Sequence, residues 1–194
     1  SVGMAMAERW LAERFNRDGQ VLFDYNVYTL CGDGDMMEGI SSEAASLAGH
    51  LRLDNLCWIY DNNTISIEGH TELAFSEDVI QRFQAYGWHT LHVTDANDLH
   101  ALSTALQTFQ RNTGAPTLIV VDSVIGYGSP HKHNTAAAHG EPLGDEEIRL
   151  TKAAYGWPED SSFLVPDEAR NVLRDALLER SRPLYEAWNQ SLSQ

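Results

Sequence analysis

Two polar segments, each directly after an apolar run, carry the residues whose types suit metal and phosphate chemistry. They are CGDGDMMEG over 31–39 and DNNTIS over 61–66. Strand-like runs at 27–31 and 56–60 lead into them, and residues 40–50 have a helical pattern. The sequence therefore predicts a strand–helix–strand unit whose two strand ends lie side by side.

The acidic and amide side chains at these strand ends predict a divalent-cation site. Asp33 and Asn63 would lie within reach of one ion. Hard cations such as Mg²⁺ bind oxygen ligands, and diphosphate oxygens and water complete their coordination. Gly32 and Gly34 would allow the backbone to approach such a phosphate closely. The pattern thus indicates a site for a diphosphate held through a metal ion.

Other glycine-rich motifs fail on spacing. A dinucleotide-binding G-x-G-x-x-G motif would need glycine at position 37, where Met37 stands, and a P-loop would need a Gly-Lys pair. An EF-hand loop beginning at Asp33 would need glycine and glutamate where the chain has Glu38 and Ala44. A tight strand-to-helix turn with solvated acids stays open as the simpler interpretation, although Asn63 at the second strand end favours the cation site.

Several longer motifs resemble those of transketolases. GDGDMMEGISSEAASLAG (32–49), followed thirty residues after Asp33 by the asparagine of DNNTISIEGH (61–70), is similar to the thiamine diphosphate motif in its transketolase form. Further matches to the family are FQAYGWHTL (83–91), APTLIVVDSVIGYGSP (115–130) and HGEPLG (139–144). The resemblance covers the chain to about residue 157 and fades beyond it.

The resemblance implies a set of cofactor-binding residues. They are Gly32, Asp33, Gly34, Glu38, Asn63, Ile65, Ile67 and His139. Asp33 and Asn63, with the backbone carbonyl of Ile65, would bind Mg²⁺ or Ca²⁺ next to thiamine diphosphate. Ile67 would press on the thiazolium side of the cofactor, although an ordinary buried isoleucine is an equally good interpretation from the residues alone.

Glu38 and His139 are the catalytic residues that the resemblance implies. Glu38 matches a glutamate near the subunit interface, in a network that links two cofactor sites; without the family it is simply an acid in a first helical turn. His139 matches a histidine over the cofactor diphosphate, although the family usually has another histidine where Ala136 stands. His131 and His133 could form an H-x-H metal pair, but the sequence offers no third ligand.

The implied reaction is the transfer of a two-carbon ketol unit between sugar phosphates, a step of the pentose phosphate pathway. The family's upstream histidines, and its following domain with the glutamate that activates the aminopyrimidine, have no match in this chain. We therefore expect a homodimer that needs a complementary chain or domains carrying the pyrimidine-binding half, and that is inactive alone. The alternatives are a non-catalytic thiamine diphosphate- or metal-binding domain, or part of another thiamine diphosphate enzyme such as deoxyxylulose phosphate synthase.

The composition fits one globular domain and excludes several classes of partner. The 194 residues are 43% hydrophobic and 21% charged, which suits a single core. A net charge of −15 opposes binding to nucleic acid or anionic membranes. No apolar run approaches a membrane span and no signal peptide opens the chain, so we expect a cytoplasmic protein. Cys31 and Cys57 lack CxxC spacing, and we expect them to be reduced thiols.

Strand and helix patterns alternate along the chain. The expected strands are 27–31, 56–60, 90–94 and 117–121, and the expected helices are 1–16, 38–50, 76–86, 98–110, 145–155 and a last one from 166. The inner face of the helix at 98–110 is expected to carry Leu99, Leu102, Leu106 and Phe109. This order predicts an α/β fold, a parallel sheet covered by helices on both faces as in the thiamine diphosphate-binding fold, with ligands at the carboxyl ends of the strands.

The chain divides at about residue 157. Residues 1–157 are expected to form the thiamine diphosphate- and metal-binding (pyrophosphate) domain, without its usual N-terminal part. Residues 158–194 are expected to be a linker and a C-terminal helix that leads toward the absent pyrimidine-binding domain and packs on the outside or is partly loose. The Gly- and His-rich loop over 126–140 is long, and long irregular loops in compact domains are usually functional or mobile.

Overall fold

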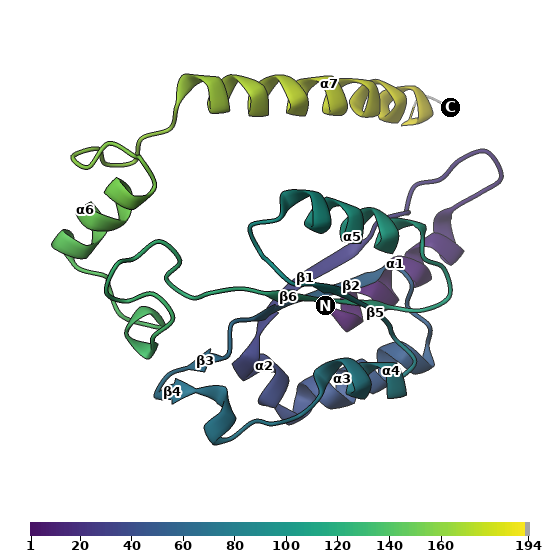
Figure 1. Ribbon diagram of the computed structural model, residues 1–194. Helices are drawn as coiled ribbons and strands as arrows, with labels where there is room; N and C mark the ends of the chain where they lie inside the picture. The colour runs from purple at the N-terminus through teal and green to yellow at the C-terminus, as the bar shows by residue number, and fades with distance from the viewer. Residues whose placement is uncertain (193–194) are drawn as a thin grey trace.

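A four-stranded parallel sheet forms the centre of the protein in the computed structural model, which describes residues 1–192 (Figure 1). The strands lie in the order β1 (Val27–Gly32), β2 (Leu56–Asn62), β6 (Thr117–Asp122) and β5 (His89–Val93). The α-helices are α1 (Val2–Phe15), α2 (Asp33–Met37), α3 (Gly39–His50), α4 (Val79–Ala85), α5 (Leu99–Arg111), α6 (Asp145–Ala154) and α7 (Asp167–Leu192). A hairpin of β3 (Ile65–Ser66) and β4 (Gly69–His70) and two 3-10 turns, η1 (Thr71–Leu73) and η2 (Ala136–Ala138), complete the described elements. The α/β fold with a parallel sheet is confirmed.

The parallel register brings the carboxyl ends of the strands to one edge. Gly32 at the end of β1 is opposite Asp61 of β2, and Asn62 is opposite Asp122 at the end of β6. The two central strands are almost entirely buried, as expected for parallel strands covered on both faces. Polar residues at this edge therefore follow directly on a rigid apolar core.

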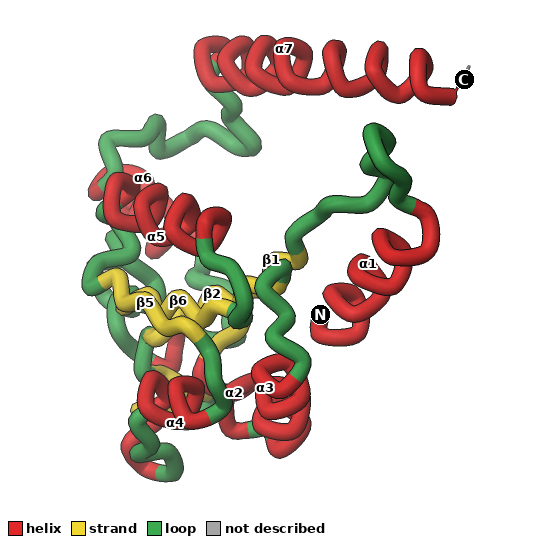
Figure 2. Tube along the Cα trace, turned by 90° about the vertical axis from the view of Figure 1, so that its right-hand side faces the viewer, coloured by secondary structure: helices red, strands yellow, loops and turns green. Residues whose placement is uncertain are grey.

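Helices cover both faces of the sheet (Figures 1 and 2). Along β2 the side chains alternate, so that Trp58 packs with Phe83 of α4 on one face while Cys57 packs with Phe109 of α5 on the other. Helices α1 and α3 contribute small or short apolar side chains to the first cluster. The core thus consists of two layers separated by the sheet.

Most helix positions agree with the sequence pattern, with two differences. The side chains of Asp78 and Asp98 cap α4 and α5 by accepting hydrogen bonds from backbone N–H groups three residues later. The prediction that Leu99 faces inward is wrong, because it is 76% exposed at the first residue of α5, whereas Leu102, Leu106 and Phe109 do pack on the sheet. The short helix α2 was not expected within the glycine-rich segment.

The C-terminal region continues beyond the sheet. Helix α7 begins near the expected residue, and none of its residues is buried. Figures 1 and 2 draw it apart from the sheet, joined through the segment after α6. That this region is a linker and a helix leading toward another domain, which packs on the outside or is partly loose, stays a prediction. Within residues 1–192, no helix is long and apolar enough to cross a membrane.

Candidate functional site

Asp33 is the buried acid at the carboxyl edge of the sheet. It is the first residue of α2, directly after β1, and its residue is 3% exposed. One carboxylate oxygen accepts a hydrogen bond from the Tyr60 hydroxyl (2.7 Å), and the other accepts one from the backbone N–H of Thr64 (3.1 Å). Thr64 has a positive φ of 62°, a conformation that costs free energy in a residue with a branched side chain. The segment after β2 is thus tied to the end of β1 through this carboxylate.

The charge of Asp33 is compensated only by neutral donors in the described part of the chain. Burial raises the pKa of the Asp33 carboxyl above its ordinary value, and the nearby Asp61 adds to this rise, although the hydrogen bonds from Tyr60 and Thr64 oppose it. No lysine or arginine among residues 1–192 forms an ion pair with it. A cation at this position would therefore remove a large part of the cost of burying the carboxylate.

Asn63 and Ile65 lie one short turn away. The Asn63 side-chain oxygen accepts a hydrogen bond from the Ile65 N–H (3.0 Å), and its NH₂ group donates to Asp61 (3.2 Å). An amide oxygen has two lone pairs, so this local bond leaves it one for a further partner. The turn holds the Asn63 oxygen beside the Thr64 N–H that binds Asp33, which places both expected side-chain ligands in neighbouring segments.

Open space adjoins the two glycines of the motif. Neither Gly32 nor Gly34 has a positive φ, and a Cβ atom added at either position would meet nothing within 4 Å. The backbone conformation therefore does not require glycine here. Although the Gly32 N–H donates to the Asp35 carboxylate (2.8 Å), the absence of a side chain at either position leaves space beside the backbone, as close approach of a phosphate requires.

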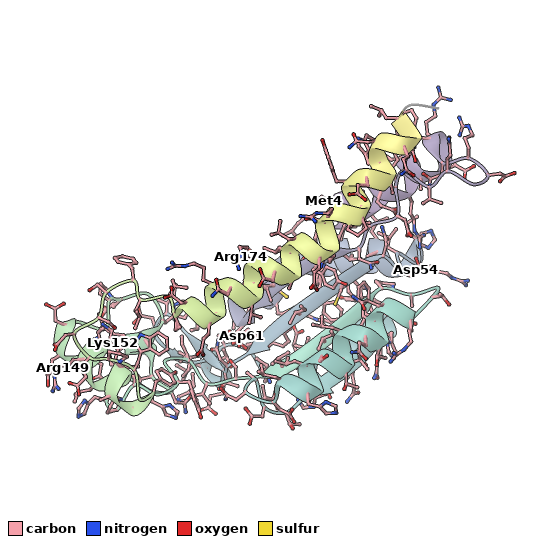
Figure 3. The ribbon with its side chains drawn as sticks, turned by 90° about the horizontal axis from the view of Figure 1, so that it is seen from above. Met4, Asp54, Asp61, Arg149, Lys152 and Arg174 are labelled. Atoms are coloured by element: carbon pink, nitrogen blue, oxygen red, sulfur yellow. The ribbon has the colours of Figure 1, made fainter. Side chains whose placement is uncertain are left out.

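Two cavities flank this edge of the sheet. Asp33 lines one of about 280 Å³, on the side of α4, and Gly32 lines another of about 540 Å³, on the side of α5. Figure 3 shows that Asp61, which lines the second cavity, lies at the end of the sheet nearer α6, with Asp54 at the opposite end. Ligand-sized space is thus found where parallel α/β sheets bind their ligands.

The other expected site residues are exposed and separate from Asp33. Glu38 is the exposed residue between α2 and α3, and His139 is exposed at the end of η2. Neither forms a hydrogen bond or an ion pair with Asp33 in the described residues. Ile67, at 71% exposure, is not the ordinary buried isoleucine of the simpler interpretation, whereas Ile65 is buried. These exposed side chains are available to a ligand or to another part of a larger assembly.

The site contains residues that the sequence pattern did not single out. A row of hydrogen bonds runs from Asp33 toward β5 at the edge of the sheet. It passes in order through Tyr60, Asn62, Asp122 and His92. Asp122 is the last residue of β6, and its position at the end of an apolar run was the available signal. The His92 ring contacts the Asp122 carboxylate at 2.8 Å.

The donor set fits a divalent ion with a diphosphate. Residues 1–192 contain no group of three or more His, Cys, Asp and Glu side chains that could hold a metal, so a protein-only cage is excluded for that part. A buried carboxylate, an amide oxygen and a backbone carbonyl in neighbouring segments are instead the kinds of oxygen donor that suit Mg²⁺ when phosphate and water supply the rest of its ligands.

A second buried carboxylate fixes the loop that carries His139. Glu147 of α6 accepts hydrogen bonds from the Ser129 hydroxyl and the His131 N–H (2.8 Å), and its second oxygen contacts the His131 ring (2.9 Å). The His131 ring is therefore engaged with a carboxylate rather than with His133. The loop over 126–140 is anchored to α6 at its centre.

Protonation of Glu147 is expected to destabilise the fold in acid. Its pKa is lowered from 4.5 to about 2, chiefly by the Ser129 hydroxyl and then by the backbone and ring of His131. A carboxyl whose pKa is depressed on folding contributes stability above its unfolded pKa, and that contribution is lost as the pH falls from about 4.5 to about 2. We expect Glu147→Gln to lower the urea midpoint at pH 7 and this difference to shrink as the pH falls through that range. The exposed Glu141→Gln variant is the control, and a Glu147 difference that is constant with pH would contradict the assignment.

The fold and the site together define an α/β domain with a buried carboxylate and open space at the carboxyl ends of its parallel strands, which is where such sheets bind their ligands. Comparison with known proteins identifies the family: the model described as "Transketolase, thiamine diphosphate binding domain" matches residues 1–194. The chain belongs to the transketolase family.

Curated relatives and solved structures agree with this. The transketolase of Geobacillus stearothermophilus is 48% identical over 100% of this chain, and that of Bacillus subtilis is 48% identical over 97% of it. Transketolase from Leishmania mexicana, at 41% identity and a TM-score of 0.94, covers 99% of the chain, and that of Pichia stipitis, in complex with sedoheptulose-7-phosphate, has 40% identity and a TM-score of 0.93 over 97%. The chain spans 28–29% of the length of these relatives.

Proposed function

We propose that this chain is the diphosphate- and metal-binding part of a transketolase, which transfers a two-carbon ketol unit between sugar phosphates when the remaining domains complement it. The observation that carries the proposal is Asp33, a buried carboxylate with only neutral hydrogen-bond donors, next to the open backbone of Gly32 and Gly34. Calorimetric titration of thiamine diphosphate with and without Mg²⁺ tests it, because binding that needs no divalent ion would exclude the assigned metal site.

Each residue of the site has a distinct task in this proposal. Asp33, Asn63 and the carbonyl of Ile65 hold Mg²⁺ or Ca²⁺, and Gly32 and Gly34 adjoin the diphosphate. When bound, thiamine diphosphate supplies the chemistry that breaks and forms the carbon–carbon bond. The chain's own residues orient the diphosphate end of the cofactor and compensate its charge.

The exposed residues of the motif extend the site toward substrate and partner. His139 lies on the loop that Glu147 anchors through His131. The imidazole of His139 is therefore exposed, but the loop that carries it is attached to α6. We assign it to the diphosphate and to the reacting end of the sugar phosphate, and Ile67 to the side of the cofactor ring. The exposure of both side chains, with space around them, supports this assignment.

We further propose that the assembled protein is a homodimer in the cytoplasm. Met37 and Ile40 are exposed apolar residues close to Glu38 in sequence, Leu47 is another further along α3, and exposed apolar side chains are typical of an interface. The two free thiols favour a reducing compartment. The net charge of −15 supports the expectation that nucleic acid is not a partner.

Glu38→Ala is expected to weaken self-association or the coupling between the two cofactor sites, because the proposal places this exposed carboxyl at the interface. Sedimentation velocity over a range of concentrations measures the association. Glu13→Ala, which removes an exposed acid from α1, is the matched control. A wild-type chain that remains a monomer at high concentration would count against the interface.

A further inference from the structure

One chain of hydrogen bonds crosses the whole carboxyl edge of the sheet. The Tyr60 hydroxyl contacts Asp33 at 2.7 Å and the Asn62 side-chain oxygen at 3.1 Å. The Asn62 NH₂ group donates to Asp122 at 2.8 Å, and the other oxygen of Asp122 contacts the His92 ring at 2.8 Å. Its members come from the first residue of α2, directly after β1, and from β2, β6 and β5, so the chain of hydrogen bonds extends across the width of the sheet.

Proton positions along this chain follow from the donors available. The Tyr60 hydroxyl has one hydrogen to donate, and an oxygen of Asp33 and the side-chain oxygen of Asn62 both lie within reach of it. That one hydrogen is shared between two acceptors, and the shorter contact is with Asp33. The Asn62 amide is oriented because its NH₂ group donates to a carboxylate oxygen of Asp122, and a carboxylate has no hydrogen to donate in return. The Asn62 oxygen therefore faces Tyr60.

Both oxygens of Asp33 are held as a result. Tyr60 binds one and the Thr64 N–H binds the other, which fixes the rotation of the carboxylate. An ionised carboxylate accepts about four hydrogen bonds, so each oxygen keeps room for a metal ion. The Tyr60 ring is itself 3% exposed and lies in the buried cluster between the sheet and α4, so it has little freedom to move.

We propose that Tyr60 is a positioning residue for the metal: its hydroxyl holds Asp33 in one orientation, and Asn62, Asp122 and His92 hold Tyr60 in turn. The proposal rests on the proposed function, because it assumes that Asp33 is a metal ligand. Hydrogen-bonded partners of this kind orient a ligating side chain without touching the ion.

Orientation matters more for one ion than for the other. Mg²⁺ requires near-ideal octahedral geometry at short distances, whereas Ca²⁺ accepts six to eight oxygens in flexible arrangements. A carboxylate released from one orientation should therefore bind Mg²⁺ much less well and Ca²⁺ only slightly less well. A general loss of stability would weaken both ions alike, so the ratio of the two affinities separates positioning from stability.

The experiment uses the chain complemented by the remaining transketolase domains, with Mg²⁺ or Ca²⁺ titrated calorimetrically at a fixed concentration of thiamine diphosphate. For Tyr60→Phe we expect the Mg²⁺ dissociation constant to rise about 10- to 100-fold, and the Ca²⁺ constant to rise less. Asp122 lies further along the row of hydrogen bonds and outside the core. Asp122→Ala should therefore change the ratio of the Mg²⁺ to the Ca²⁺ dissociation constant in the same direction, by a smaller factor. Tyr86→Phe removes a hydroxyl from a tyrosine that packs on Phe83 and should leave both constants unchanged.

The outcomes distinguish this inference from the proposed function. Unchanged Mg²⁺ affinity in Asp33→Ala would overturn the metal assignment and the inference with it. Weak Mg²⁺ binding in Asp33→Ala, together with Tyr60→Phe values equal to those of Tyr86→Phe, would overturn the inference alone. Equal losses for Mg²⁺ and Ca²⁺ in Tyr60→Phe would overturn it too, because orientation would then have no part in the effect.

Discussion

Replacing Asp33 by alanine is expected to weaken the binding of Mg²⁺ and thiamine diphosphate by about 100-fold or more in the complemented protein. Substitution of residues that merely orient a ligand typically costs 10- to 100-fold in metal affinity, and loss of the ligand itself should cost at least as much. The effect should be large here because, among residues 1–192, Asp33 is the one buried carboxylate at this edge of the sheet, and because the remaining donors, an amide and a carbonyl, are neutral.

Titration calorimetry with both components measures this loss. Asp18→Ala removes one negative charge from the turn after α1, far from the strand ends, and controls for the change in net charge. Asp33→Asn keeps the shape of the side chain while removing its charge, so it should fold at least as well and still bind weakly. Wild-type affinity in both Asp33 variants would remove this residue from the site.

The 194-residue polypeptide by itself is not expected to turn over sugar phosphates. The family resemblance assigns the glutamate that activates the aminopyrimidine to a domain with no match in this sequence. Loss of an acid–base partner typically costs about 10²- to 10⁴-fold in rate. Without that domain, much of the surface around the cofactor ring would also be absent. The acids described at the strand ends, including Asp33 and Glu38, are assigned to the diphosphate end or the interface and do not replace it.

A coupled ketol-transfer assay with thiamine diphosphate and Mg²⁺ checks this expectation. The chain is assayed alone and again after addition of a polypeptide that carries the remaining domains of the Geobacillus stearothermophilus relative, which is 48% identical over the shared region. Activity only on mixing would identify a part that requires its complement. Full activity of the unmixed chain would refute the proposal, whereas a mixture with Asp33→Ala in place of the wild type should stay at background.

The fold was predictable from local patterns where those patterns are strong. The apolar runs that became β2 and β6 are buried on both faces, and Asp78 and Asp98 cap their helices as polar residues before a helical pattern usually do. Helix α2 was not predictable in this way, because it has only five residues and Gly34 among them lowers its helix propensity. Two contacts stabilise this helix. The Asp35 carboxylate accepts a hydrogen bond from the Gly32 N–H, and the Met36 side chain of the helix is buried in the core.

The site was predictable only in its sequence-local part. Spacing and family resemblance pointed to Asp33 and Asn63, whose segments the structure brings together through Thr64. The contacts from Tyr60 to His92 depend on the register between strands that are distant in sequence, and no local pattern encodes that register. The periodicity of α5 likewise could not reveal that Leu99 is exposed, since it carries no information on how far the sheet extends beneath the helix.

The two cysteines have a practical consequence for spectroscopy. Burial raises the pKa of both Cys31 and Cys57 to about 12, so neither is a thiolate at neutral pH. Since labelling reagents attack the thiolate, both native sulfurs should remain unmodified while an introduced surface cysteine reacts. Cysteines introduced together at the exposed positions 67 and 139 would therefore carry a pair of spin labels without any change to the native thiols, and the distance between the labels would report how the two loops approach each other when cofactor is added.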